Sequence, residues 1–205
     1  MPPARRLVLA SGSPARLALL RAAGFAPEVI VSGVDEVAVA ACSSRVEEVP
    51  ELVERLARAK AEAVAERPEA EGALIIGCDS LFELDGEVRG KPLSAENAAA
   101  RIRDQRGRTG VLHTGHCLVD QESGQTVSAV RSTEVTFGPM TDEEVDAYVA
   151  TGEPLEVAGA FTLDGRAAVF VDGIDGDPSN VIGLSLPELR LLLDEIGVPV
   201  ISLWT

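Results

Sequence analysis

The chain has 205 residues, 46% of them hydrophobic, and a formal net charge of -15 at pH 7. This length can bury one substantial core or two small ones, so we expect a single domain over residues 1–205, with room for two lobes. The negative charge argues against polymeric nucleic acid as a partner. No apolar run approaches the roughly 20 residues of a membrane helix, which argues against membrane insertion.

The three cysteines and two lysines carry further information. Cys42, Cys78 and Cys117 are odd in number and form no C-x-x-C pair, which argues against a disulfide framework or a zinc site and favours a reducing cytoplasm. Of the 18 basic residues, only Lys60 and Lys91 are lysines. Because a compact ammonium and a planar guanidinium are not interchangeable, the two lysines suggest sites that need a point charge, and the alternative is that two surface lysines remain by chance.

The first elements in chain order are a buried strand over residues 7–10 and a helix over residues 13–23. A strand that leads directly into a helix N-terminus leaves free backbone N–H groups, which attract anions. Ser11, Ser13 and Arg16 would add side-chain donors there. An ordinary capped turn explains this junction almost as well.

A helix over residues 50–67 follows Val34, Asp35 and Glu36. Its expected apolar stripe is formed by Leu52, Leu56, Ala59 and Ala63. Lys60 falls inside this arc, where a charge is out of place. It could reach the edge of the core and stay solvated, or it could direct an ammonium into a cleft.

The strongest buried-strand signal covers residues 73–78 and ends at Asp79 and Ser80. Ligands of α/β sheets bind beyond the carboxyl ends of strands, so Asp79 is a candidate site residue, although it could also cap a turn. A hairpin is expected over residues 81–88. The Gly-Lys-Pro sequence after it lacks the spacing and the Ser or Thr of a P-loop, so it is not a nucleotide-binding loop of that type.

The second half continues the alternation of helices and strands, which predicts an α/β chain. Expected elements are a helix over 95–106, a strand around 112–116, a capping-box helix from 141 to near 152, a loop over 153–161, a strand around 169–171, a turn over 176–180 and a helix over 186–196. His113 and His116 are the only histidines and have no third ligand at a metal-binding spacing. We therefore interpret His113 as a packed structural residue.

Several short motifs occur in the order seen in one protein family. They are Ser11-Gly12-Ser13-Pro14-x-Arg16, Val34-Asp35-Glu36, Arg58-x-Lys60-Ala61, Gly77-Cys78-Asp79-Ser80, Gly90-Lys91-Pro92, His113-Thr114-Gly115, Glu153-Pro154, Ala158-Gly159-Ala160-Phe161 and Val181-Ile182-Gly183-Leu184. With these motifs the chain resembles the Maf family of nucleotide pyrophosphatases over about residues 7–197. Each motif is weak alone, but nine in order are specific.

The resemblance implies an α/β fold like that of Maf proteins and inosine triphosphatases, an elongated mixed sheet flanked by helices about a central cleft. It implies hydrolysis of common or modified nucleoside triphosphates to monophosphate and pyrophosphate, with Mg²⁺ or Mn²⁺, and at family level a homodimer. By position it gives Asp79 the role of proton acceptor and Glu36 that of metal or water ligand, with Asp79 as a second metal ligand. Base and metal ligand stay open as the main role of Asp79, because metal coordination would lower its pKa and weaken it as a base. The substrate-binding residues are Ser11, Ser13, Arg16, Lys60 and Lys91.

Three positions bear on selectivity for the nucleobase. In the branch that resembles thymidine and uridine triphosphate hydrolases, Arg, Thr and Gln stand where this chain has Ala15, Ser80 and Asp164. In the branch for 7-methylguanosine triphosphate these residues are Trp, Gln and Glu. The chain matches neither set, and Val157 replaces a lysine that is usual in the family, so the base is left unassigned.

Two other functions are alternatives. The chain could bind nucleotides as a regulator of cell division without turnover, but the retention of Asp79, Glu36 and both lysines argues against an inactive site. A nucleotidyl or phosphoryl transferase is disfavoured by the lack of a P-loop.

Overall fold

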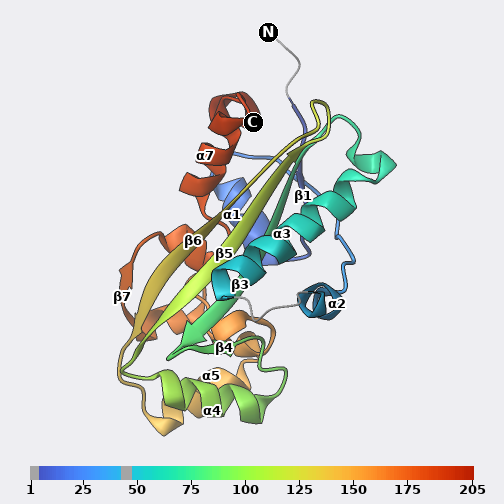
Figure 1. The fold of residues 1–205 in the computed structure, drawn as a ribbon. Coiled ribbons are helices and arrows are strands. Elements are labelled where there is room, and N and C mark those ends of the chain that lie inside the picture. Colours follow the sequence, from blue (N-terminus) through green and yellow to red (C-terminus); the bar gives the residue numbers. More distant parts are fainter. Residues whose placement is uncertain (1–4, 43–47) are drawn as a thin grey trace.

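The computed structural model describes residues 5–42 and 48–205, which form a mixed α/β fold around one twisted sheet (Figure 1). The strands are β1 (Leu7–Leu9), β2 (Glu28–Val29), β3 (Leu74–Leu84), β4 (Glu87–Arg89), β5 (Thr109–Asp120), β6 (Gln125–Phe137) and β7 (Val171–Asp175). They lie in the order β2-β1-β3-β5-β6-β7, and β4 pairs with β3. Strand β1 is parallel to β2 and β3 and the other pairs are antiparallel, which confirms the expected mixed sheet flanked by helices.

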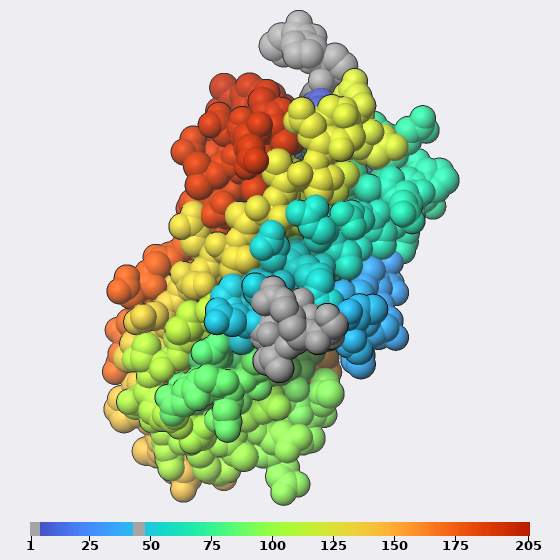
Figure 2. Space-filling view, viewed as in Figure 1, coloured from blue at the N-terminus to red at the C-terminus, as the bar shows by residue number. Residues whose placement is uncertain are grey.

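The α-helices cover both faces of the sheet. They are α1 (Pro14–Ala22), α2 (Glu36–Ala41), α3 (Val49–Ala65), α4 (Ala95–Gln105), α5 (Asp142–Ala150), α6 (Pro178–Ile182) and α7 (Leu186–Glu195). In Figure 1, α3 crosses one face of β3 and β5, whereas α1 and α7 lie on the other face and α4 and α5 gather at one end. Figure 2 shows the face with α3, beside which α2 lies. Within the described residues, no helix is both long and apolar enough to cross a membrane.

Hydrophobic side chains fill the layers on each side of the sheet. Val8, Ile75 and Cys117 pack under α3, while Leu9 and Ile76 point to the opposite layer, under α1 and α7. This division follows from the alternation of side chains along a strand. At the far end, a third cluster contains three phenylalanine rings in mutual edge-to-face contact, with centroids 4.9 to 5.8 Å apart.

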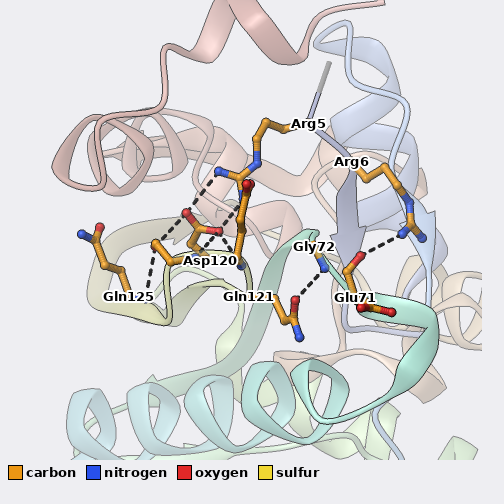
Figure 3. A network of polar contacts seen from close by, with 9 residues as sticks. Arg5, Arg6, Glu71, Gly72, Asp120, Gln121 and Gln125 are labelled. Carbon is orange, nitrogen blue, oxygen red and sulfur yellow. Dashed lines mark hydrogen bonds and ion pairs between the residues drawn. The ribbon is translucent and has the colours of Figure 1, made fainter. Parts of the chain in front are cut away.

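Polar contacts fasten the start of β1 to the rest of the sheet (Figure 3). The Arg5 guanidinium binds both carboxylate oxygens of Asp120, with 3.1 Å between Nη1 and Oδ2. This hydrogen bonding holds the pKa of Asp120 at about 2, below its usual value. Nearby, Arg6 donates to the carbonyl of Glu71, and the Gln121 side chain accepts from the N–H of Gly72 at 2.6 Å. These contacts stabilise the sheet end that carries no proposed site residue.

Most expected elements are confirmed, including the N-terminal helix, the hairpin and the capping box of Thr141 and Glu144. The elements differ from the expectations in four places. Helix α2 was not expected, α6 replaces part of the turn over 176–180, and β7 begins at Val171 rather than near 169. The fourth concerns β3, which continues through Asp79 and Ser80 to Leu84 instead of ending before them.

Candidate active site

The edge of the sheet has a gap beside the middle of β3. On one side of β3, β1 pairs with residues 74–76 and β4 pairs with residues 82–84. Between them, in the described part of the chain, residues 77–81 pair only with β5 on the opposite side. Since successive side chains of a strand point to opposite faces, Asp79 faces α3 and Ser80 faces α1 and α6. Groups from both faces can therefore meet a ligand at this open edge.

Lys60 joins two carboxylates on the α3 face. Its Nζ lies 2.5 Å from Oδ1 of Asp79 and 2.6 Å from Oε1 of Glu36. The Lys60 and Asp79 side chains are nearly buried, at 11% and 9% exposure, whereas Glu36 is 57% exposed. Glu36 is the first residue of α2, which Asp35 caps by accepting from the N–H of Ala38 at 3.0 Å. The structure thus brings together the two expected acids and one of the two expected lysines.

Asp79 is in an environment that opposes its ionisation. Burial raises the pKa of this carboxyl above its ordinary value, although the charge and hydrogen bond of Lys60 act in the opposite direction. A carboxylate with a raised pKa holds a proton more strongly than a solvated one, which suits a general base.

Close packing of α3 against the sheet sets the position of Lys60. A Cβ atom on Gly77 would overlap the carbonyl oxygen of Ala57, and one on Gly115 would overlap that of Val53. The buried face of α3 consists of Val53, Leu56, Ala57, Lys60, Ala61 and Val64. The buried face is therefore rotated by about one residue from the expected stripe, which was wrong. Gly77 and Gly115 lack side chains, so α3 can pack closely against the sheet with Ala57 and Ala61 facing it.

The loop between β1 and α1 contains the expected hydroxyl and guanidinium groups. Ser13 is the N-cap of α1 and accepts from the N–H of Arg16 at 3.3 Å. The Arg16 side chain donates to Gly183 O at 2.7 Å, Cys78 O at 2.9 Å, and the hydroxyls of Ser11 and Ser80 at 3.1 and 3.0 Å. Four of its five N–H groups are therefore bound to protein acceptors. Arg16 connects the loop, β3 and the end of α6.

Three further residues that were expected in the site make no contact, within the described residues, with the cluster of Lys60, Asp79 and Glu36. The Lys91 side chain is 58% exposed, and its ion pair within the described residues is with Glu156 at 3.9 Å. Ala15 is a partly exposed residue of α1, and Asp164 is exposed in the segment after Phe161. The contacts of the described residues do not join any of them to Asp79, so their roles stay predictions.

Two buried residues near Ser80 were not singled out by the sequence. Thr114 Oγ1 lies 2.9 Å from Ser80 Oγ and 3.2 Å from the carbonyl oxygen of Asn180. Thr114 stands inside the His-Thr-Gly motif, which was the one available signal. His113 is buried, as expected, and its Nδ1 lies 2.8 Å from Ser132 Oγ.

Comparisons with known proteins show the family to which this chain belongs. The family model described as Maf-like protein matches residues 6–196. A nucleoside triphosphate pyrophosphatase of Streptomyces coelicolor is 62% identical, covering 98% of this chain and 96% of that protein. Proteins of the same name from Salinispora tropica and Mycobacterium sp. (strain JLS) are 53% and 48% identical, and each match covers 98% of this chain and 88% or 98% of the relative. The chain belongs to the Maf-like protein family.

Proposed function

We propose that this protein is a nucleoside triphosphate pyrophosphatase that cleaves between the α and β phosphates and releases monophosphate and pyrophosphate. The observation that carries the proposal is the Lys60 ammonium between Asp79 and Glu36, beside the open edge of β3. Relatives that match nearly the whole chain bear the name of this activity. The edge presents cations and acids together, as in-line attack of water on a phosphate requires.

The donor set of this site suits a divalent cation. Oxygens of Asp79 and Glu36 already share one cationic partner, the Lys60 ammonium, and carboxylate oxygens are the ligands that Mg²⁺ prefers. No group of three or more His, Cys, Asp or Glu residues arranged for a metal occurs in residues 5–42 and 48–205. Asp79 and Glu36 would therefore hold Mg²⁺ or Mn²⁺ together with water and phosphate oxygens. When bound, such an ion neutralises phosphate charge and lowers the pKa of bound water.

Side chains of the protein would accept the proton, bind the phosphates and stabilise the leaving group. Asp79 either accepts a proton from the attacking water or serves chiefly as a ligand of the cation, since coordination would lower its pKa and weaken it as a base. Lys60 holds this carboxylate in place and faces the phosphate charge. Ser11 and Ser13 lie at the N-terminus of α1, where the helix dipole favours phosphate oxygens. Lys91, with its exposed ammonium, can move to the leaving pyrophosphate.

We also propose a cytoplasmic location and leave the dimer as a prediction. All three cysteines are free thiols, and burial raises the pKa values of Cys78 and Cys117 to about 11 and 12. Thiols of this kind suit a reducing compartment.

The test is product analysis with purified protein and Mg²⁺ or Mn²⁺ over a panel of common and modified nucleoside triphosphates. We expect pyrophosphate as product and a loss of kcat of about 100-fold or more in Asp79→Asn. Asp194→Asn, an exposed position on α7, is the matched control and should keep wild-type rates. Release of orthophosphate would contradict α–β cleavage. Tight binding without turnover across the panel would favour the nucleotide-binding regulator instead.

A further inference from the structure

Strand β4 stops pairing with β3 just before the stretch of β3 that has one partner only. The last residue pair between the two strands is Phe82 with Arg89. If the pairing continued in the same register, Lys91 would lie opposite Ser80, and the chain would cover residues 77–81. Instead, the chain leaves the sheet after Arg89. Lys91 therefore lies at the border of this stretch, two residues after the last pair.

Helix α4 binds the main chain on both sides of Lys91. Nδ2 of Asn97 donates to the carbonyl of Pro92 at 3.2 Å. Nη1 of Arg101 donates to the carbonyl of Gly90. Asn97 and Arg101 are four residues apart and therefore lie on the same side of the helix. Pro92 has no N–H group that could pair with β3. The main chain around Lys91 is thus fixed to α4 and not to the strand edge.

A third contact shows how this segment runs. Asp104, about one turn after Arg101 on α4, accepts from Nη2 of Arg89 at 2.8 Å. Later positions of the helix thus bind earlier positions of the segment, so the segment runs antiparallel to α4. The chain then reverses at Leu93, whose φ of 62° lies in the left-handed region that a bulky residue seldom adopts. The reversal leads to Ser94, the N-cap of α4.

The helix that holds the segment is itself fixed to the core. Ala98 and Ile102 of α4 are buried in the cluster that contains the three phenylalanine rings. Gln105, which is 1% exposed, donates from Nε2 to the carbonyl of Gly159 at 2.8 Å. The Lys91 side chain, by contrast, is 58% exposed. A rigid support thus carries a cationic side chain that is free to move.

The partner of Arg101 is unusual among the arginines of this helix. Arg103 donates to the carboxylates of Asp142 and Asp146 on α5. Within the described residues, Arg101 has no carboxylate partner, and its guanidinium binds the carbonyl of Gly90. A hydrogen bond from a charged donor is stronger than one between neutral groups. Arg101 therefore holds the main chain more firmly than a neutral side chain would.

Resting on the proposed function, we propose that Asn97 and Arg101 are positioning residues that hold the main chain on both sides of Lys91, so that its ammonium reaches the pyrophosphate half of the substrate. Neither side chain touches the substrate. A support that is fixed before the substrate binds lowers the entropy lost in placing the ammonium. Without these hydrogen bonds the segment moves, and the charge no longer meets the leaving group.

The experiment uses Arg101→Met, Asn97→Ala and Lys91→Met, alone and in the two pairs that include Lys91→Met. Arg103→Met is the matched control, because it removes a guanidinium from the same helix without touching the segment. Two quantities are measured. The first is kcat on the nucleoside triphosphate that the wild type hydrolyses fastest. The second is the dissociation constant, by calorimetry with Mg²⁺, of inorganic pyrophosphate and of the corresponding nucleoside monophosphate.

We expect Arg101→Met to lower kcat about tenfold and Asn97→Ala about threefold, as fits the loss of one charged and one neutral hydrogen bond. Pyrophosphate should bind more weakly by similar factors, whereas the affinity for monophosphate should not change. Neither variant should have a further effect in the Lys91→Met background, since both act through Lys91. Alanine favours helix at position 97, so unwinding of α4 would not explain the loss.

Two results overturn the inference. One is that Arg101→Met lowers kcat no more than Arg103→Met does. The other is an equal loss with and without the Lys91 side chain, as direct contact of Arg101 with the substrate or general damage to the fold would give. If the wild type binds pyrophosphate but turns over no nucleotide, only the proposed function fails, and the same comparison is made on the dissociation constants. If the wild type does neither, both proposals are wrong.

Discussion

The Lys60 ammonium lies 2.5 Å from the Asp79 carboxylate, and the two side chains meet in the interior between α3 and β3. Neither charge would be tolerable there alone, because each loses most of its contact with water. Glu36 contacts Lys60 from the outer side, so the buried ammonium lies between two carboxylates. Because of this arrangement, both the stability and the activity of the protein should depend on Lys60.

We predict that Lys60→Met lowers both the stability and the activity of the protein. Asp79 would be left buried without its counter-charge, which should cost about 3–5 kcal/mol of unfolding free energy at pH 7. Activity should fall by at least about 100-fold, because a charge that faces the phosphates is lost. Urea unfolding and pyrophosphate release measure the two effects.

Lys91→Met is the matched control for this prediction. Lys91 is 58% exposed and its ion pair spans 3.9 Å, so its removal should change the unfolding free energy by less than about 1 kcal/mol. Equal destabilisation by the two variants would contradict the assigned difference between the lysines.

The close contact of α3 with the sheet gives a second prediction. Gly77→Ala would place a methyl group against the Ala57 carbonyl, so α3 must move outward and carry Lys60 away from Asp79. We expect a loss of about 1–3 kcal/mol of stability and a fall in kcat. Gly90→Ala is the control, since no atom lies within 4 Å of its added Cβ. If Gly77→Ala were as stable and active as Gly90→Ala, the glycine would not be setting the position of Lys60.

Arg16 gives a third prediction. A lysine at this position has one ammonium and cannot reach acceptors on the loop, β3 and Gly183 at once, so Arg16→Lys should lower both stability and kcat/KM despite its conserved charge. Restored activity at high Mg²⁺ would instead indicate that Arg16 serves mainly to bind phosphate.

Local patterns predicted most helices, but they missed α2 and misjudged the turn over 176–180 and the middle of β3. Asp79 and Ser80 are typical of turns, and their low strand propensity suggested that the strand ended at Cys78. In the structure, pairing with β5 on one side is enough to extend the strand through residues 77–81, which have no strand partner on the other side within the described residues. Strand pairing of this kind is a long-range property that no local pattern reveals.

The partners of Arg16 illustrate the same limit. The sequence indicated a guanidinium near a helix N-terminus, but two of its acceptors are main-chain carbonyls, of Cys78 and of Gly183, and the latter is 167 residues away in sequence. A carbonyl group has no residue-specific signal. The side chains of a site can therefore be proposed from sequence, whereas the groups that orient them emerge only from the fold.

The two histidines give the last prediction, a loss of stability in mild acid. Burial lowers the pKa of His116 to about 4, and its Nε2 accepts from the N–H of Ser185 at 2.8 Å, which requires the neutral ring. The unfolded chain takes up this proton near pH 6.5, so the stabilisation is complete above that value and is lost as the pH falls towards 4. Between pH 7 and 5 we expect His116 to account for about 2 kcal/mol of unfolding free energy. Burial also lowers the pKa of His113, which adds in the same direction.

Urea unfolding of wild type and His116→Gln at pH 7, 6 and 5 measures this effect. The glutamine carbonyl can still accept from Ser185 but binds no proton, so the variant should lose much less stability on acidification than wild type does. His113→Gln, at the less deeply buried ring, should flatten the dependence by a smaller amount. An unchanged slope in His116→Gln would instead assign the acid sensitivity to the carboxylates, which ordinarily take up protons in a lower pH range than histidine.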